Sequence, residues 1–246
     1  MTPTLFDPPD DAARLRERAL TIHARLCAEY GCPVPFFASK DPLSQLVSSL
    51  LTARTKNADS AQAYRQLRER FPAWTDVRDA PTADVEAAIA PCTWPEQKAP
   101  RIQRVLREIT ADPATIGLSL DVLAEWPAGR ARAWLERLPG VGPKTSAATL
   151  LFSTLRVPAL PVDSHHHRVA VRLGLLDTNV AVGPSHAILA AQLPPEWDAQ
   201  TVYDHHEILM FHGQRCCFHR SPACGRCPVY DLCVWGGKKS ARAENR

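Results

Sequence analysis

Four cysteines near the C-terminus have the spacing C-x6-C-x2-C-x5-C: Cys217, Cys224, Cys227 and Cys233. Thiolates are soft ligands, and four of them in one short segment can hold a tetrahedral zinc ion or a [4Fe–4S] cluster. Disulfides are disfavoured, because the first residues, MTPTLFDPPDDAARL, lack the basic and apolar regions of a secretion signal. The pattern predicts a metal or cluster site but does not decide between zinc and iron–sulfur. Cys216 lies one position outside the spacing, so we predict that it is not a ligand.

A second candidate site is the segment LPGVGPKT at residues 138–145, which lies between two stretches predicted to be helical. Gly140 and Gly142 provide the backbone freedom of a tight turn and allow close approach of another molecule. Pro143 suits the first position of a helix, where no N–H donor is needed. Backbone N–H groups at such a helix N-terminus can bind a phosphate oxygen of DNA. The segment therefore predicts a helix-hairpin-helix.

A third motif, VDSH at residues 162–165, follows the hairpin and precedes the cysteines. The order of these three motifs closely resembles the endonuclease III family of DNA glycosylases. Two further stretches agree, SSLLTAR at 48–54 and HHEILMFHG at 205–213, and the likeness covers roughly residues 36–235. The resemblance implies a bifunctional DNA glycosylase and AP lyase that excises oxidised pyrimidines from duplex DNA in base excision repair. It also implies that the four cysteines hold a [4Fe–4S] cluster.

The resemblance further implies an all-α, two-domain helix-hairpin-helix glycosylase fold with a C-terminal cluster loop. Residues 36–156 are expected to form the central domain. Residues 1–35 and 157–246 are expected to form the second domain, which holds the cluster. A DNA-binding cleft between the two domains would bring catalytic groups together from both sides of the boundary.

Apolar residues recur at helical spacing, and no alternating strand pattern of useful length occurs. Helices are expected on both sides of the hairpin, at 129–137 and 144–155. Asp41 is predicted to cap a helix that has Pro42 at its first position. The predicted apolar stripes are Leu15, Ala19, Ile22 and Leu26; Leu43, Leu46, Val47, Leu50 and Leu51; Ala61, Tyr64, Leu67 and Phe71; Ile102, Val105, Leu106 and Ile109; and Val169, Ala170 and Leu173.

The composition suits a globular protein with two modest cores, since 45% of the 246 residues are hydrophobic. No apolar run approaches the ~20 residues needed to cross a bilayer. The formal charge is only +3, so attraction to DNA must depend on local clusters of cations. Cys27, Cys32, Cys92 and Cys216 follow no ligand spacing and are expected to be buried or free thiols of a reducing compartment. We therefore expect a cytoplasmic monomer whose partner is double-stranded DNA with damaged bases or abasic sites.

Lys144 is the candidate nucleophile. It is expected in the first turn of the helix that Pro143 opens, where the partial positive charge of the helix N-terminus disfavours the ammonium form. Partial burial would act in the same direction. A neutral amine is what attack on C1′ of a damaged nucleoside requires, and the product is a Schiff base. Position alone leaves a contact to phosphate or solvent open, whereas the resemblance assigns Lys144 the role of nucleophile.

Asp163 suits the N-cap of a helix that begins near His165. A carboxylate near the amine can also stabilise positive charge on the sugar and assist proton transfer, and the resemblance assigns this catalytic role to Asp163. His165, His166 and His167 are not expected to share a metal ion, because consecutive helical residues point about 100° apart.

An enzyme that extrudes a base must stabilise the gap left in the duplex. In the family a glutamine fills this gap, and the matching residue here is Arg54, which can fill the gap or contact phosphate. The cluster loop also departs from the family, since it carries fewer cations than usual, and Arg130, Arg132 and Arg137 are expected to compensate. The remaining expected DNA contacts are Gly140, Val141, Gly142, Thr145, His165, Arg168 and Arg220.

Two other functions stay open. A monofunctional mismatch glycosylase would share the fold and the cluster, although such relatives lack a lysine at the position of Lys144. A zinc-stabilised DNA-binding module without catalysis is the second alternative, which broad absorbance near ~400 nm from an iron–sulfur cluster would exclude. The preferred lesion has no legible signature in the sequence.

Overall fold

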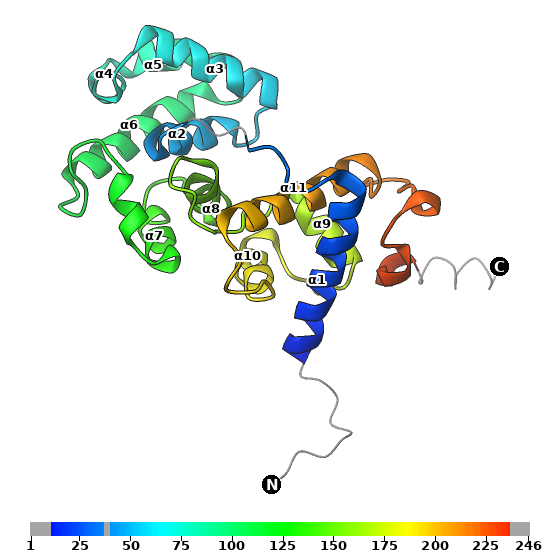
Figure 1. The fold of residues 1–246 in the computed structure, drawn as a ribbon. Coiled ribbons are helices and arrows are strands. Elements are labelled where there is room, and N and C mark those ends of the chain that lie inside the picture. Colours follow the sequence, from blue (N-terminus) through cyan, green and yellow to red (C-terminus); the bar gives the residue numbers. More distant parts are fainter. Residues whose placement is uncertain (1–10, 37–39, 237–246) are drawn as a thin grey trace. The chain divides into compact units, whose positions relative to one another are not determined.

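A computed structural model of the chain describes residues 11–36 and 40–236, and within these ranges every regular element is helical (Figure 1). The all-α prediction is therefore confirmed. The elements are α1 (Asp11–Tyr30), α2 (Pro42–Thr52), α3 (Asn57–Arg70), α4 (Trp74–Asp79), α5 (Thr82–Ala88), α6 (Pro95–Ala111), η1 (Asp121–Glu125), α7 (Ala128–Leu135), α8 (Pro143–Phe152), α9 (Ser164–Arg172), α10 (Val182–Ala190), α11 (Ala199–Arg215), η2 (Cys224–Arg226) and η3 (Tyr230–Leu232).

The helix α2 forms as its sequence predicts. The Asp41 carboxylate accepts a hydrogen bond from the backbone N–H of Ser44 at 2.9 Å, and Pro42 is the first helical residue. A cap of this kind is worth about 1 kcal/mol, because it satisfies one of the N–H groups that lack a partner within the helix. The whole predicted apolar stripe is buried: Leu43, Leu46, Val47, Leu50 and Leu51.

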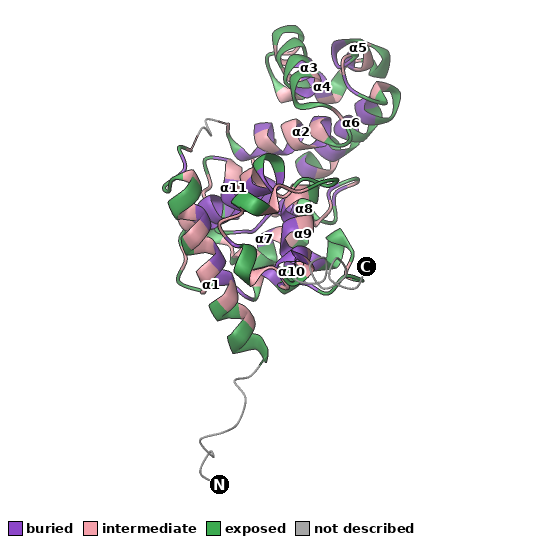
Figure 2. Cartoon of the chain, turned by 90° about the vertical axis from the view of Figure 1, so that its right-hand side faces the viewer, coloured by how far each residue is buried: buried purple, intermediate pink, exposed green. Residues whose placement is uncertain are grey.

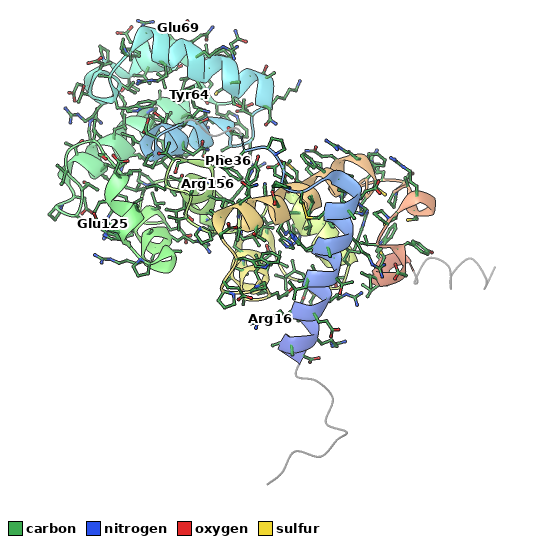
Figure 3. All side chains as sticks on the ribbon, in the orientation of Figure 1. Arg16, Phe36, Tyr64, Glu69, Glu125 and Arg156 are labelled. Carbon is green, nitrogen blue, oxygen red and sulfur yellow. A yellow bond between two sulfur atoms is a disulfide. The ribbon has the colours of Figure 1, made fainter. Side chains whose placement is uncertain are left out.

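The prediction for α3 is wrong at one residue. Ala61 is exposed, and Ala63 is buried in its place, together with Leu67. Residues 61 and 63 are separated by about 200° around a helix, so only one of them can face the core. Tyr64, labelled in Figure 3, is partly buried and lies against Trp74 with a ring-centroid distance of 6.4 Å. The outer side of α3 is exposed (Figure 2).

The chain divides into two compact units. The first contains Met1–Phe36 and Val162–Arg246, and the second is Phe37–Pro161. In the second unit, α2 packs on α8 and α3, and α6 packs on α4 and α5. Its core is one cluster of buried side chains to which every helix from α2 to α8, and η1, contributes.

In the first unit, α1 and α9 both pack on α11, which is largely buried (Figure 2). The N-terminal helix therefore shares a core with the C-terminal part of the chain. Phe36, labelled in Figure 3, extends this unit by packing edge-to-face on Tyr203 with a ring-centroid distance of 4.8 Å.

Cys27 and Cys32 form a disulfide, so the prediction that both are buried or free thiols is wrong. The helix α1 ends at Tyr30, and Gly31 adopts φ +84°, which turns the chain back toward the helix. The Cα atoms of the two cysteines lie 5.1 Å apart, within the usual range for a disulfide. Cys92 and Cys216 are buried free thiols, as predicted.

No helix in the described part of the chain has the length and apolar character to span a membrane.

Candidate functional site

The turn between α7 and α8 has the geometry of a tight hairpin. The Val141 N–H donates to the carbonyl of Leu138 at 3.1 Å, and Gly140 adopts φ +80°. A Cβ atom on Gly140 would lie 2.5 Å from Cδ of Arg101, so both backbone conformation and space favour glycine there. Gly142 has an ordinary φ of −105°, and a Cβ there would meet no atom within 4 Å. The side of the hairpin at Gly142 is therefore open.

The helix α8 begins at Pro143, as the hairpin motif predicts. The Ser146 hydroxyl donates to Oε1 of Glu136 at 2.7 Å and so joins the start of α8 to the end of α7. Val141 is buried in the core, and its N–H already donates to the carbonyl of Leu138. A phosphate contact by Val141 stays a prediction. Lys144 is exposed, so the partial burial that the sequence suggested for it is not observed.

Asp163 is the N-cap of α9, as predicted. Its Oδ1 accepts a hydrogen bond from the backbone N–H of His166 at 2.7 Å. Burial, with a further contribution from the negative charge of Asp163, raises the pKa of Glu207 on α11 to about 7. Glu207 lies within the HHEILMFHG stretch at 205–213, and no role was predicted for it. The signal that could have identified Glu207 is the position of a carboxyl side chain between buried residues of α11.

The three consecutive histidines at the start of α9 have different neighbours. Nδ1 of His165 lies 3.1 Å from a guanidinium nitrogen of Arg168, and Nε2 of His167 lies 2.8 Å from the carbonyl of Val180. His166 is buried beside His205, and neither nitrogen of its imidazole ring has a hydrogen-bond partner in the described part of the chain. Burial and the neighbouring histidines keep the pKa of His166 well below its usual value.

Arg168 connects α9 to the first predicted cluster ligand. Its Nε donates to the carbonyl of Cys217 at 3.1 Å, and a terminal nitrogen donates to the carbonyl of Gly213 at 2.7 Å. A Cβ on Gly213 would lie 2.8 Å from Cβ of His165, so this glycine allows α9 and α11 to approach closely. This structural role of Arg168 was not predicted. DNA contacts by Arg168 and His165 stay predictions.

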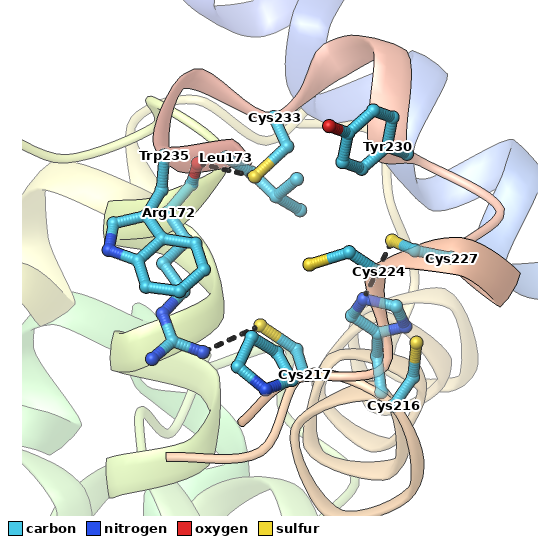
Figure 4. Close-up of a pocket in the computed structure, with 11 residues that line it drawn as sticks. Arg172, Leu173, Cys216, Cys217, Cys224, Cys227, Tyr230, Cys233 and Trp235 are labelled. Atoms are coloured by element: carbon cyan, nitrogen blue, oxygen red, sulfur yellow. Dashed lines mark hydrogen bonds between the residues drawn. The ribbon is translucent and has the colours of Figure 1, made fainter. Parts of the chain in front are cut away.

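The four predicted ligands line one pocket (Figure 4): Cys217, Cys224, Cys227 and Cys233. Buried Arg172 donates to Sγ of Cys217 at 3.2 Å and to the carbonyl of Phe218 at 2.7 Å, and its guanidinium lies over Trp235. The Gly236 N–H donates to Sγ of Cys233 at 3.3 Å. Hydrogen-bond donors directed at cysteine sulfurs suit thiolate ligands, because they stabilise the negative charge.

The spread of the sulfur atoms distinguishes a cluster from a single ion. In the described part of the chain, one group of potential ligands has all of its ligand atoms within 4.8 Å of one another: His212, Cys216 and Cys227. The four predicted ligands do not form such a group, whereas one zinc ion with Zn–S bonds of about 2.3 Å would hold four sulfurs about 3.8 Å apart. Four cysteines spread around a pocket fit an iron–sulfur cluster better than a single zinc ion.

Cys216 lies closer to this site than the spacing suggested. Its thiol donates to the carbonyl of Ala223 at 3.5 Å, and it belongs to the same small group as Cys227 and His212. Nε2 of His212 is 3.6 Å from Sγ of Cys227, and its Nδ1 is 3.0 Å from the hydroxyl of Tyr30. The prediction that Cys216 is not a ligand stays open to test.

The other expected DNA contacts lie on the surface of the unit to which each belongs. Arg54 is exposed, directly after the C-cap of α2, and Arg220 is exposed in the loop that follows Cys217. Two of the arginines expected to compensate for a weakly charged loop are paired, since Arg132 lies 3.3 Å from Glu136 and Arg137 lies 3.1 Å from Asp112.

Comparison with known proteins agrees with this arrangement. Residues 47–194 match the HhH-GPD superfamily base excision DNA repair protein family, and residues 220–233 match the iron–sulfur binding domain of endonuclease III. Endonuclease III of Bacillus subtilis is 29% identical over 203 residues, which cover 82% of this chain and 85% of that protein. The chain therefore belongs to the HhH-GPD superfamily of base excision DNA repair proteins and, within it, to the endonuclease III family. It is an endonuclease III-like DNA glycosylase.

Two solved structures share the fold. A non-covalent endonuclease III–DNA complex superposes with a TM-score of 0.74 at 23% identity, covering 92% of this chain and 98% of that one. A trapped endonuclease III–DNA covalent intermediate with an estranged adenine gives a TM-score of 0.73 at 24% identity, with the same coverage.

Proposed function

We propose that the protein is a bifunctional DNA glycosylase and AP lyase that excises oxidised pyrimidines from duplex DNA. The observation that carries this proposal is the position of Lys144. An exposed amine stands in the first turn of α8, directly after a hairpin whose backbone suits phosphate binding. A lesion held by its flanking phosphates at this hairpin would bring its C1′ atom near the amine.

In the proposed reaction, the amine of Lys144 attacks C1′, and the bond between C1′ and the damaged base breaks. The departing base takes a proton, and opening of the sugar ring leaves an imine between Lys144 and C1′. Loss of a C2′ proton then expels the 3′ phosphate and cleaves the strand. We assign Asp163 the stabilisation of positive charge on the sugar and the transfer of protons. The covalent endonuclease III–DNA intermediate noted above supports a reaction of this class.

We also propose that Cys217, Cys224, Cys227 and Cys233 hold a [4Fe–4S] cluster. The bound cluster would cross-link the C-terminal segment and has no part in proton transfer or bond cleavage. Arg172 supports this assignment, because its buried cation lies beside the sulfur of Cys217 and would balance part of the negative charge of a thiolate-bound cluster. The loop held in this way carries Arg220, which we propose as a phosphate contact.

Strand cleavage on a panel of duplexes tests the substrate class. The panel contains thymine glycol, dihydrouracil, uracil opposite guanine, and adenine opposite oxidised guanine. We expect cleavage of the first two duplexes without added base or heat. Base loss that needs alkali to cleave the strand, on either of the last two duplexes alone, would instead indicate a monofunctional mismatch glycosylase.

A further inference from the structure

A buried lysine in α6 holds the turn that follows α2. The Lys98 residue is only 4% exposed. Its ammonium donates to the carbonyl of Leu51 at 2.7 Å, to the carbonyl of Ala53 at 2.9 Å and to the hydroxyl of Thr55 at 2.6 Å. An ammonium has three protons, so this network uses all of its donors.

The network suits the end of a helix. The last carbonyls of a helix have no partner within it and carry partial negative charge, so a cation there is stabilising. Burying an ammonium is unfavourable unless it is fully hydrogen-bonded, and the three acceptors around Lys98 meet that requirement. The arrangement therefore fixes residues 51–55 more firmly than an ordinary helix end would.

Arg54 lies between two of the residues that Lys98 holds. It adopts φ +53°, a left-handed conformation that residues other than glycine adopt only when their surroundings impose it. The Thr55 hydroxyl that binds Lys98 also accepts a hydrogen bond from the Thr93 N–H at 3.2 Å. The start of α6 and the end of α2 are thus joined, and the side chain of Arg54 projects into solvent from this fixed base.

We infer that Lys98 is a positioning residue for Arg54, and that the clamp on residues 51–55 presents the guanidinium to the gap left by an extruded nucleotide. This inference depends on the proposed function, in which Arg54 enters that gap. Filling the gap must offset the stacking and pairing that the extruded nucleotide loses. A side chain on an already ordered turn loses less conformational entropy on binding than one on a mobile loop.

A double-mutant cycle on excision rate tests the inference. Lys98→Met removes the ammonium and keeps most of the volume, and Arg54→Ala removes the guanidinium. We expect each change to slow single-turnover excision of thymine glycol several-fold, and the double variant to be no slower than Arg54→Ala. Thr55→Val should show part of the effect of Lys98→Met. Thr110→Val, which removes a hydroxyl elsewhere on α6, should match the wild type.

If Lys98→Met slows the Arg54→Ala protein by the same factor as it slows the wild type, the lysine acts independently of Arg54 and the inference is wrong.

Hydrogen exchange gives a second measurement that needs no activity. The Thr55 amide, which donates to the carbonyl of Thr52 at 3.0 Å, should exchange faster in Lys98→Met and Thr55→Val than in Thr110→Val. Unchanged exchange in the first two variants would contradict the clamp. A wild-type protein without excision activity would refute the proposed function instead.

Discussion

At the scale of single residues, the two glycines of the hairpin have different reasons to be glycine. Gly140 has a left-handed backbone conformation, and Arg101 occupies the space where a Cβ would lie. Gly142 has neither constraint, since its φ is ordinary and its Cβ position is empty. A side chain at Gly142 would therefore disturb only a molecule that approaches from outside.

This difference predicts that alanine at Gly140 lowers stability, whereas alanine at Gly142 weakens DNA binding. Gly140→Ala should lower the free energy of unfolding by about 1–2 kcal/mol, because alanine disfavours the left-handed conformation. Gly142→Ala should leave stability within about 0.5 kcal/mol of the wild type but weaken DNA binding, because it obstructs the approach of a phosphate. Urea unfolding and DNA-binding titrations measure the two effects. Equal DNA affinity for Gly142→Ala and the wild type would show that phosphate does not bind there.

Buried histidines predict how stability changes with pH. Burial, together with His23 and His206, lowers the pKa of His205 to about 3 from its usual 6.5. The unfolded chain therefore binds a proton that the folded chain excludes, and stability is lost as pH falls below 6.5. Between pH 7.5 and pH 5, this one residue should contribute a loss of about 2 kcal/mol. His205→Leu should reduce the acid sensitivity by that amount in urea unfolding at pH 7.5 and pH 5. An unchanged pH profile would contradict the burial of this imidazole.

At the scale of elements, several helices support more than one candidate site. The helix α9 starts with the cap Asp163 and ends with Arg172, which donates to Sγ of Cys217. The helix α6 carries Lys98 against the end of α2 and Arg101 against the hairpin glycine. A change in the orientation of either helix would therefore affect two candidate sites together.

The cluster loop predicts different outcomes for two adjacent cysteines. Cys217→Ser should lose the visible absorbance of the iron–sulfur cluster or lower the yield of folded protein, because a ligand is removed. Cys216→Ser should keep the spectrum, since its thiol contacts a backbone carbonyl. Absorbance spectra and iron content of the two purified variants measure this. The reverse outcome would show that the first ligand of the four-cysteine pattern is Cys216 and not Cys217.

At the scale of the whole molecule, features set by local sequence were the most predictable. The caps at Asp41 and Asp163, the proline at the start of α8 and most apolar stripes depend on neighbours a few residues away. Contacts between distant residues were not predictable, because the sequence does not encode them as a local pattern. The three acceptors of Lys98 and the bond from Arg168 to the carbonyl of Cys217 are of this kind.

The division into two units also limits what local patterns reveal. The proposed nucleophile Lys144 belongs to the unit Phe37–Pro161, and Asp163 belongs to the other. Motif order and family membership, more than periodicity, connect these two residues to one reaction. Covalent capture of the amine by DNA tests that connection most directly.

Borohydride trapping on duplex DNA with a thymine glycol lesion is the decisive measurement. Reduction converts an imine to a stable amine, so the wild type should form a covalent protein–DNA complex, and peptide mapping should locate the bond at Lys144. Lys144→Gln should form no such complex while keeping the absorbance of the cluster and most of its affinity for DNA. Trapping that persists in Lys144→Gln, or that maps to another lysine, would contradict the proposed mechanism.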